Sequence, residues 1–427
     1  MHLTRRYFLK LSGAIGAYLG VTPFDLFAED AAPAAALKPV RKGKTLVLVF
    51  MRGGVDGLNL VIPWKDKNYS TLRKSIQIPS PSREKNDGRA IDLDGFFGLH
   101  PRLAALLPFF KDGTAAALHA VGHDRNTRSH FEEQDVWETG VTGNTINSDG
   151  WVNRHLLTST GHGPIRAVAI GEALPRIMHG KCCAYAVRGI DDLSLPDGRT
   201  DRATVGAALE HAYRKDAKKK AGDARDLLAD TGQATLEGIE KLRGIVGQKY
   251  EPKLPYPQTD IARQLMQAAR LIKADVGLEV VEVDYGGWDT HQFQGAAQGP
   301  YGDLAQGLAE ALAAFVTDLG EKANDVIVLT MSDFGRTAEE NGTGGTDHGW
   351  GNVLLAMSPS LKREGRKPVL GTWPGLAPDQ LHDKRDLMHT TDFRDVMAEV
   401  VKGHLGNETL AKVLPDHEFK AVGLLQA

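Results

Sequence analysis

The chain has 427 residues, of which 42% are hydrophobic and 25% charged, and its formal net charge is −3. This composition is typical of a globular protein and excludes a disordered chain, a collagen-like chain and a protein with many membrane spans. The small negative charge leaves no basic excess for a phosphate backbone, which argues against nucleic-acid binding. Two cysteines are too few for a disulfide framework or for the common multi-cysteine zinc sites.

The N-terminal segment is typical of an export signal. Residues 1–28 join a short basic region to an apolar stretch that is too short and too glycine-rich for a spanning helix of roughly 20 residues. The pair Arg5 and Arg6 resembles the twin-arginine export signal. The sequence therefore predicts a twin-arginine signal peptide over residues 1–28 and a flexible lead-in over residues 29–43. The mature protein would be periplasmic or extracellular and would keep no membrane span.

Apolar runs and helical patterns alternate along the first half of the mature chain. Residues 44–51 and 114–121 form continuous apolar runs, which are typical of buried parallel strands. A helix is predicted over residues 101–112, with a proline at its start and a glycine after its end. Helical patterns rich in alanine, lysine and glutamate predict a helical insertion over about residues 200–275.

The second half of the chain continues the alternation. Further strands and helices are predicted at residues 278–283, 301–322, 326–331, 353–357 and 392–404. Because strands alternate with helices, the chain is predicted to be an α/β protein with a mostly parallel central sheet and helices on both faces. Residues 44–427 would form this single domain.

Polar clusters follow the predicted strands at the points where the strands end. In an open α/β sheet, ligands bind outside the carboxyl ends of the strands, so these clusters are expected to converge. Aspartate and histidine together suit a divalent metal ion and favour zinc, manganese or iron over calcium. The candidate metal ligands are Asp56, Asp289, His291, Asp333 and His348.

Several of these candidates also have a structural interpretation. Asp56 precedes a glycine in a pattern typical of a turn, and Asp333 could cap a following helix. Asp289 and His291 could make internal hydrogen bonds of a loop. Asp347 fits a loop role as well as ligation. His348 stands among glycines, which does not fit a histidine on an apolar face.

A second kind of candidate is the run Arg128, Ser129 and His130. The hydroxyl group of Ser129 is a candidate nucleophile, and the guanidinium group of Arg128 could hold an anion. A solvated loop is the alternative for this run. Arg336 is a further candidate for binding the substrate's oxygen atoms.

In their order along the chain, these stretches resemble a family of twin-arginine-exported proteins known as domain of unknown function 1501. The resemblance covers about residues 45–405 and rests on VFMRGGVDGLNLVIP, RSHFEEQDVWETG, GGWDTH and MSDFGRTAEENGTGGTDHGWGN. That family has no settled activity to carry over.

More widely, the order of these residues resembles the alkaline phosphatase and sulfatase superfamily. The resemblance implies an alkaline phosphatase-like fold and two-metal hydrolysis of an ester. It implies Ser129 as nucleophile, with Arg128 or Arg336 on the substrate. The implied metal ligands are Asp56, Asp289, His291, Asp333 and His348. One departure concerns Phe334, because the superfamily usually has a histidine after this aspartate; His130 is the candidate replacement.

The sequence therefore predicts an exported metal-dependent hydrolase of phosphate or sulfate esters. It would hold one or two divalent ions, zinc or manganese, and act on an anionic ester after passage through the twin-arginine translocase. The alternative is a non-catalytic protein of the same fold that binds a cell-envelope glycan or a partner protein. A redox enzyme is disfavoured, because the sequence has no GxGxxG fingerprint and no cysteine cluster for an iron–sulfur centre.

Overall fold

The computed structural model describes residues 40–82, 88–143, 148–161, 163, 165–182, 184–190 and 249–425. The predicted signal peptide, the lead-in up to residue 39 and residues 200–248 of the predicted helical insertion lie outside the described residues. The described part of the lead-in begins at Val40 and contacts the domain. The backbone N–H group of Val40 donates to the carbonyl oxygen of Thr160 at 3.0 Å. The end of the predicted insertion is helix α9, Asp260–Lys273.

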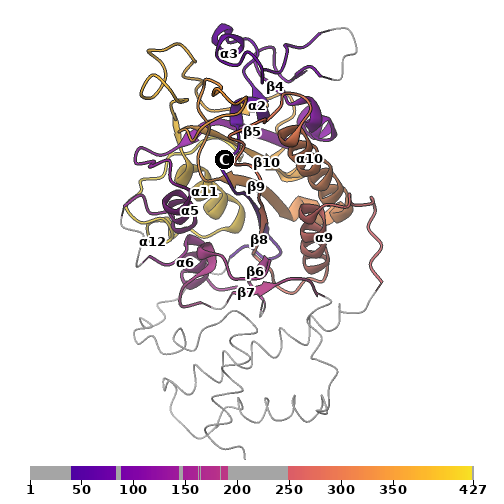
Figure 1. The fold of residues 1–427 in the computed structure, drawn as a ribbon. Helices are drawn as coiled ribbons and strands as arrows, with labels where there is room; N and C mark the ends of the chain where they lie inside the picture. The colour runs from indigo at the N-terminus through magenta and orange to yellow at the C-terminus, as the bar shows by residue number, and fades with distance from the viewer. Residues whose placement is uncertain are drawn as a thin grey trace, which may run out of the picture.

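A central sheet runs through the molecule (Figure 1). Its strands are β1 (Thr45–Met51), β5 (Ala115–Gly122), β6 (Ala167–Ile170), β7 (Tyr185–Val187), β8 (Val280–Tyr285), β9 (Val326–Ser332), β10 (Asn352–Met357), β11 (Val369–Leu370) and β12 (Thr391–Asp392). Their order is β11-β5-β10-β9-β1-β8-β6-β7, and β12 also pairs with β5.

The pairing of the strands confirms the prediction of a mostly parallel sheet. Within the described sheet, β10 alone runs antiparallel, to both β5 and β9. Strand β1 lies between β8 and β9, and all seven of its residues are buried. Burial on both faces explains why its sequence is a continuous apolar run rather than an alternating one.

Helices cover both faces of the sheet, as predicted (Figure 1). On one face lie α9, α10 (Pro300–Leu319) and α4 (Leu107–Lys111), and on the other lie α5 (His130–Thr139), α6 (Trp151–Leu157), α11 (Phe393–Val400) and α12 (Leu410–Val413). Strand β1 supplies both cores, since Val47 and Val49 belong to one apolar cluster while Leu46 and Leu48 belong to the other.

Two predicted helices differ in detail from the observed ones. The predicted helix over residues 101–112 is a 3-10 helix, Pro101–Leu106, followed by α4. Pro108 stands in the first turn of α4, where a residue without an N–H group is tolerated, and this position suits a restart of the helix. The closing helix α11 continues into a π-helical turn, Val401–Leu405.

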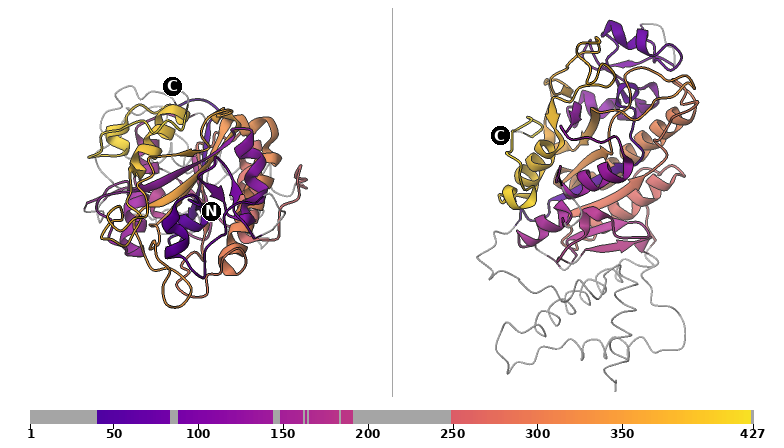
Figure 2. Two further views of the ribbon diagram at one scale, coloured as in Figure 1. Left: turned by 90° about the horizontal axis from the view of Figure 1, so that it is seen from above. Right: turned by 60° about the vertical axis from the view of Figure 1, so that its left-hand side comes forward.

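A smaller sheet lies beside the central one. It consists of β2 (Val61–Ile62), β4 (Gly98–Leu99) and β3 (Ile91–Asp92), and the short helices α2 (Gly57–Leu60) and α3 (Lys67–Leu72) flank β2 in the chain. Helix α3 lies at one end of the molecule, at the top of Figure 1 and of the right-hand view in Figure 2.

The topology brings several loops to one edge of the central sheet. Strands β1, β8 and β9 are parallel neighbours, so the loops after them start at the same edge. Strand β10 runs the opposite way, so the loop that precedes it reaches that edge too. Strand β5 is antiparallel to β10, which places the loop between β5 and α5 there as well. Among the described residues, no helix has the length and apolar character that crossing a bilayer requires.

Candidate metal centre

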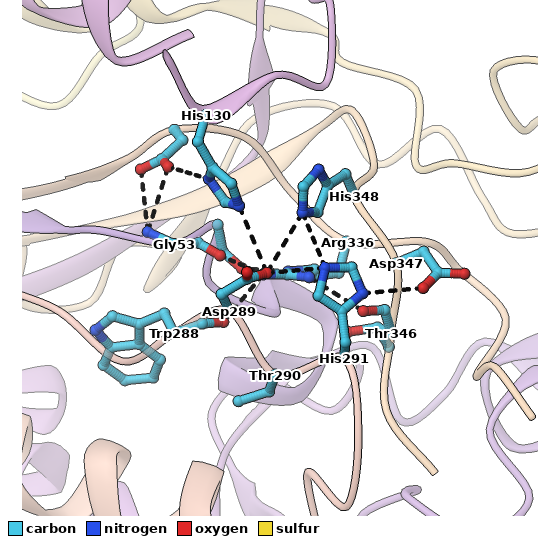
Figure 3. Close-up of polar contacts among 12 residues, drawn as sticks. Gly53, His130, Trp288, Asp289, Thr290, His291, Arg336, Thr346, Asp347 and His348 are labelled. Atoms are coloured by element: carbon cyan, nitrogen blue, oxygen red, sulfur yellow. Dashed lines mark hydrogen bonds and ion pairs between the residues drawn. The ribbon is translucent and has the colours of Figure 1, made fainter. Parts of the chain in front are cut away.

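Four side chains, from the loop after β8, from the loop between β9 and β10 and from the first turn of α5, converge on one point (Figure 3). We call His130, Asp289, His291 and His348 the candidate metal centre. The Oδ1 atom of Asp289 lies 3.5 Å from Nε2 of His130, 3.0 Å from Nε2 of His291 and 3.4 Å from Nε2 of His348. The Nε2 atoms of His291 and His348 are 3.0 Å apart.

These separations suit a tetrahedral metal ion. Zinc bound to imidazole nitrogen or carboxylate oxygen at about 2.0–2.1 Å requires ligand atoms about 3.3–3.4 Å apart. The four observed separations, from 3.0 to 3.5 Å, bracket that value. The donor set of three imidazoles and one carboxylate is one that zinc accepts.

The other ring nitrogen of each histidine faces an acceptor. This arrangement assigns the ring proton to Nδ1 and leaves Nε2 with a lone pair directed at the centre. The three contacts are His130 Nδ1 with Asp333 Oδ2 at 2.6 Å, His291 Nδ1 with Asp347 Oδ1 at 3.0 Å, and His348 Nδ1 with the Arg128 carbonyl oxygen at 2.8 Å.

The Nε2 atoms that face the centre have few hydrogen-bond donors to accept from among the described residues. Nε2 of His130 is buried and makes no hydrogen bond within the described part of the chain. Two lone pairs 3.0 Å apart, on His291 and His348, need a proton or a cation between them. Both observations fit a centre that binds a cation.

The ring of Phe334 packs against His130 and His348, with ring centres 4.7 Å apart in each case. The hydrogen bond with Asp333 raises the pKa of His130, although partial burial opposes the shift. Asp333 is fully buried and also accepts from Gln134 Nε2 at 3.0 Å, so it supports His130 and is not in the centre itself.

Arg336 holds Asp289 in place. Its Nη2 atom donates to Asp289 Oδ1 at 2.5 Å, and further donors go to backbone oxygens of Gly53, Gly54 and Thr346. Burial would raise the pKa of the Asp289 carboxyl group, but the hydrogen bond and charge of Arg336 outweigh it and lower that pKa. The side chain of Arg336 is fully buried, which differs from the substrate-facing position predicted for it.

Asp56 lies in a separate, buried polar network. Its Oδ2 atom accepts from Arg73 Nη1 at 2.5 Å and from Gln294 Nε2 at 2.6 Å, and both Asp56 and Arg73 are fully buried. A guanidinium group already neutralises this carboxylate. The structure therefore does not bring Asp56 into the candidate metal centre, and the described residues contain one ligand cluster rather than the two that a two-ion site needs.

The remaining two candidates stand beside the centre. Ser129 is half-buried at the N-terminal cap position of α5, and its side chain makes no capping hydrogen bond. The guanidinium group of Arg128 is bound to Asp383 and Asp386, at 2.9 Å and 2.7 Å. Arg128 is thus tied to two carboxylates, although the sequence predicted that it would hold an anion.

The centre is accessible from solvent. The side chains of His130, His348, His291 and Asp289 are 23%, 26%, 38% and 47% exposed. A cavity of about 220 Å³ adjoins it, with Asp347, Asn341 and Arg385 among its lining residues. Asp347 lines this cavity and also contacts His291, so the cavity lies next to one of the four residues of the centre.

A family model described as "Protein of unknown function (DUF1501)" matches residues 188–413. The chain belongs to this family. No curated protein sequence matches the chain.

Several solved structures are similar to this DUF1501 protein. The C-terminal periplasmic domain of EcEptC from Escherichia coli, in complex with Zn, is 11% identical with a TM-score of 0.34, covering 76% of this chain and 78% of that one. A second structure of that domain is 10% identical with a TM-score of 0.37, covering 90% and 92%. The PsFucS1 sulfatase from Pseudoalteromonas sp. is 13% identical with a TM-score of 0.35, covering 89% and 74%. Identities this low say nothing about activity.

Sequence reasoning missed the residues that bind two of the candidate carboxylates. Arg73 binds Asp56 outside the centre and Gln134 binds Asp333 beside it, and neither carried a signal, because each partner is more than 10 residues away in the chain. The sequence left Asp347 as either a ligand or a loop residue, and the structure shows it accepting from His291. Its position next to His348 was the one available clue.

Proposed function

We propose that this DUF1501 protein is a metal-dependent hydrolase of phosphate or sulfate esters. The observation that carries the proposal is the convergence of three imidazole nitrogens on one carboxylate oxygen, at 3.0 to 3.5 Å. The Asp289 carboxylate is paired with Arg336, while Asp333 and Asp347 accept from the imidazole rings of His130 and His291.

Zinc is the proposed ion, held by His130, Asp289, His291 and His348. These four residues would fill a tetrahedral shell, so a bound zinc ion would act as a Lewis acid on an ester oxygen only by expanding to five-coordination, as zinc sites do in transition states. Asp333, Asp347 and the Arg128 carbonyl group keep the three imidazoles in the tautomer that ligation requires.

Ser129 is the proposed nucleophile. It immediately precedes His130, at the N-terminus of α5, where unpaired backbone N–H groups favour the negative charge of a phosphate or sulfate group. His130 is not available as its general base, since one ring nitrogen faces Asp333 and the other faces the centre. Asp333 and Asp347 have acceptor roles toward histidines and are not proposed as bases.

Two observations favour a second candidate, a non-catalytic protein that binds an envelope glycan or a partner protein. Arg73 binds the carboxylate of Asp56, and the part of the chain that the structure describes contains no second cluster of ligands. The guanidinium groups of Arg128 and Arg336 are bound to carboxylates of the protein itself. On this candidate, the ion would have a structural or ligand-binding role.

The test combines metal analysis with turnover. The purified chain is expected to carry one zinc ion, to hydrolyse p-nitrophenyl phosphate or p-nitrophenyl sulfate, and to lose this activity with a chelator and regain it with zinc. His179→Ala, which changes an exposed histidine outside the centre, is the control and should behave as wild type. A bound ion without turnover of either ester would favour the binding protein, and a chain without any metal affinity would contradict both.

We also propose export by the twin-arginine route. Changing both Arg5 and Arg6 to Lys keeps the charge but removes the planar guanidinium groups, and is expected to hold the protein in the cytoplasm. Fractionation of cells that express each form measures this. Full export of the double-Lys variant would contradict the proposal.

A further inference from the structure

Arg128 has a backbone conformation that is rare for its residue type. Its φ angle is +60°, in the left-handed region that bulky residues seldom adopt. The backbone N–H group of Arg128 donates to Asn126 Oδ1 at 2.7 Å, which helps to fix the turn. Strained backbone of this kind is concentrated at functional sites, where the surrounding structure maintains it.

The side chain of Arg128 supplies the contacts that hold this conformation. Its Nε atom donates to Asp386 Oδ2 at 2.8 Å and its Nη2 atom to Asp383 Oδ2 at 2.9 Å. Asp386 is fully buried, so this anchor is a fixed part of the fold. The guanidinium group also lies over the ring of Trp350, 5.4 Å from its centre.

The backbone of Arg128 contacts the candidate metal centre. Its carbonyl oxygen accepts the Nδ1 proton of His348 at 2.8 Å. The direction of this carbonyl group depends on the backbone angles of Arg128. With the left-handed conformation lost, His348 would be free to move its proton to Nε2, the atom that faces Asp289.

We propose that Arg128 is a positioning residue for His348, acting through its backbone carbonyl group and not through its charge. Its guanidinium group, held by Asp383 and Asp386, maintains the left-handed turn that aims the carbonyl oxygen. This inference rests on the proposed metal centre and replaces the anion-holding role predicted from the sequence.

Three substitutions separate the backbone from the side chain. Glycine adopts the left-handed region freely, alanine adopts it at a cost, and valine is the most strongly excluded. Zinc affinity is measured by competition with a chromogenic chelator. For Arg128→Gly it should stay within roughly threefold of the wild-type value. It should fall roughly tenfold for Arg128→Ala and further for Arg128→Val. An anion-holding or purely charge-based role predicts the same loss for all three.

A matched control comes from Asp275, an exposed residue after α9 with a φ angle of +53°. The same three substitutions at Asp275 carry the same backbone cost, but should leave zinc affinity unchanged. If Arg128→Val does not fold, the difference between Arg128→Gly and Arg128→Ala decides the question. Equal losses in these two, or no loss in either, would overturn the proposal.

The tautomer of His348 can be measured without any metal. In the metal-free chain labelled with ¹⁵N-histidine, the His348 signal should report a proton on Nδ1 in wild type and in Arg128→Gly. It should shift toward Nε2 in Arg128→Ala, with His348→Gln providing the assignment. If wild type binds no zinc, the proposed function fails while this measurement still decides the role of Arg128. An unchanged tautomer in Arg128→Ala would overturn that role even in a zinc-binding chain.

Discussion

Strand β8 has a cluster of histidine, carboxylate and arginine at each of its ends, and the two clusters differ in how their polar atoms are satisfied. Asp289 follows β8 in the candidate metal centre, whereas Glu279 directly precedes it. Glu279 accepts from Arg166 Nε at 2.6 Å and lies 3.1 Å from Nε2 of His155. Ser159 completes what we call the closed cluster, since its hydroxyl group accepts from Arg166 Nη2 at 2.8 Å.

Every side chain of the closed cluster has its partners inside the protein. Nδ1 of His155 lies 3.1 Å from Asn407 Nδ2, so both of its ring nitrogens are occupied, and the side chain is fully buried. In the candidate metal centre, Nε2 of His130 is buried without a hydrogen bond among the described residues. The same residue types thus stabilise the fold at one end of β8 and leave ligand atoms free at the other. Residue type alone therefore does not identify a site.

The largest expected effect distinguishes Ser129, beside the candidate metal centre, from Ser159 in the closed cluster. Ser129→Ala is expected to lower kcat for p-nitrophenyl phosphate or sulfate by at least about a thousandfold, because it removes the proposed nucleophile, and to leave bound zinc and thermal stability unchanged. Ser159→Ala should leave kcat unchanged and lower the free energy of unfolding by about 1 kcal/mol, because it removes a buried hydrogen bond. Steady-state kinetics and urea unfolding measure the two. Full activity of Ser129→Ala would assign the attack to water instead.

The next largest effect distinguishes His348 of the candidate metal centre from His155 of the closed cluster. His348→Ala removes a proposed ligand and is expected to weaken zinc binding by at least about a hundredfold, with little effect on the stability of the metal-free chain. His155→Ala should keep the zinc affinity but lower the free energy of unfolding by about 1–3 kcal/mol, since it removes a buried hydrogen-bond partner while Glu279 stays paired with Arg166. Chelator competition and urea unfolding of both variants test the distinction. Metal loss in His155→Ala, or retention in His348→Ala, would reverse the assignment of the clusters.

A smaller effect separates two carboxylates that support histidines. Asp333→Asn replaces the acceptor of the His130 Nδ1 proton and is expected to weaken zinc binding by about 10–100-fold. Glu279→Gln is its counterpart in the closed cluster and should act on stability alone, because no proposed ligand contacts it. An Asp333→Asn chain with unchanged zinc affinity would show that His130 is not a ligand.

The fold was predictable because its strands are short apolar runs. Each strand that borders the candidate metal centre, including β1, β8 and β9, was predicted within about two residues of its observed ends. Parallel strands end at a common edge, and this rule predicts that Asp289, His291 and His348 lie together. The antiparallel direction of β10 was not predicted, since apolar runs carry no information on strand direction.

The polar contacts that were not predicted depend on long-range pairing. Arg73 lies in a polar stretch without periodicity, and its contact with Asp56 joins the end of α3 to the loop after β1. The same holds for His155 and Glu279, which are 124 positions apart. The burial of Arg336 follows from carbonyl groups on several loops, and no local pattern in MSDFGRT reveals it.

The smallest expected effect concerns acid stability and a histidine outside both clusters. Burial lowers the pKa of His404 to about 4, although the hydrogen bond of its Nε2 with the Thr45 carbonyl oxygen opposes the shift. The unfolded chain, with a histidine pKa of about 6.5, binds this proton more readily, so stability is full above pH 6.5 and is lost as the pH falls toward 4. At pH 5.5 the loss from this residue is about 1 kcal/mol. His404→Gln retains an N–H donor but cannot titrate, so its free energy of unfolding should fall less between pH 7 and pH 5.5. Urea unfolding at both pH values measures the difference, and equal slopes for the two proteins would show that His404 is not the residue responsible.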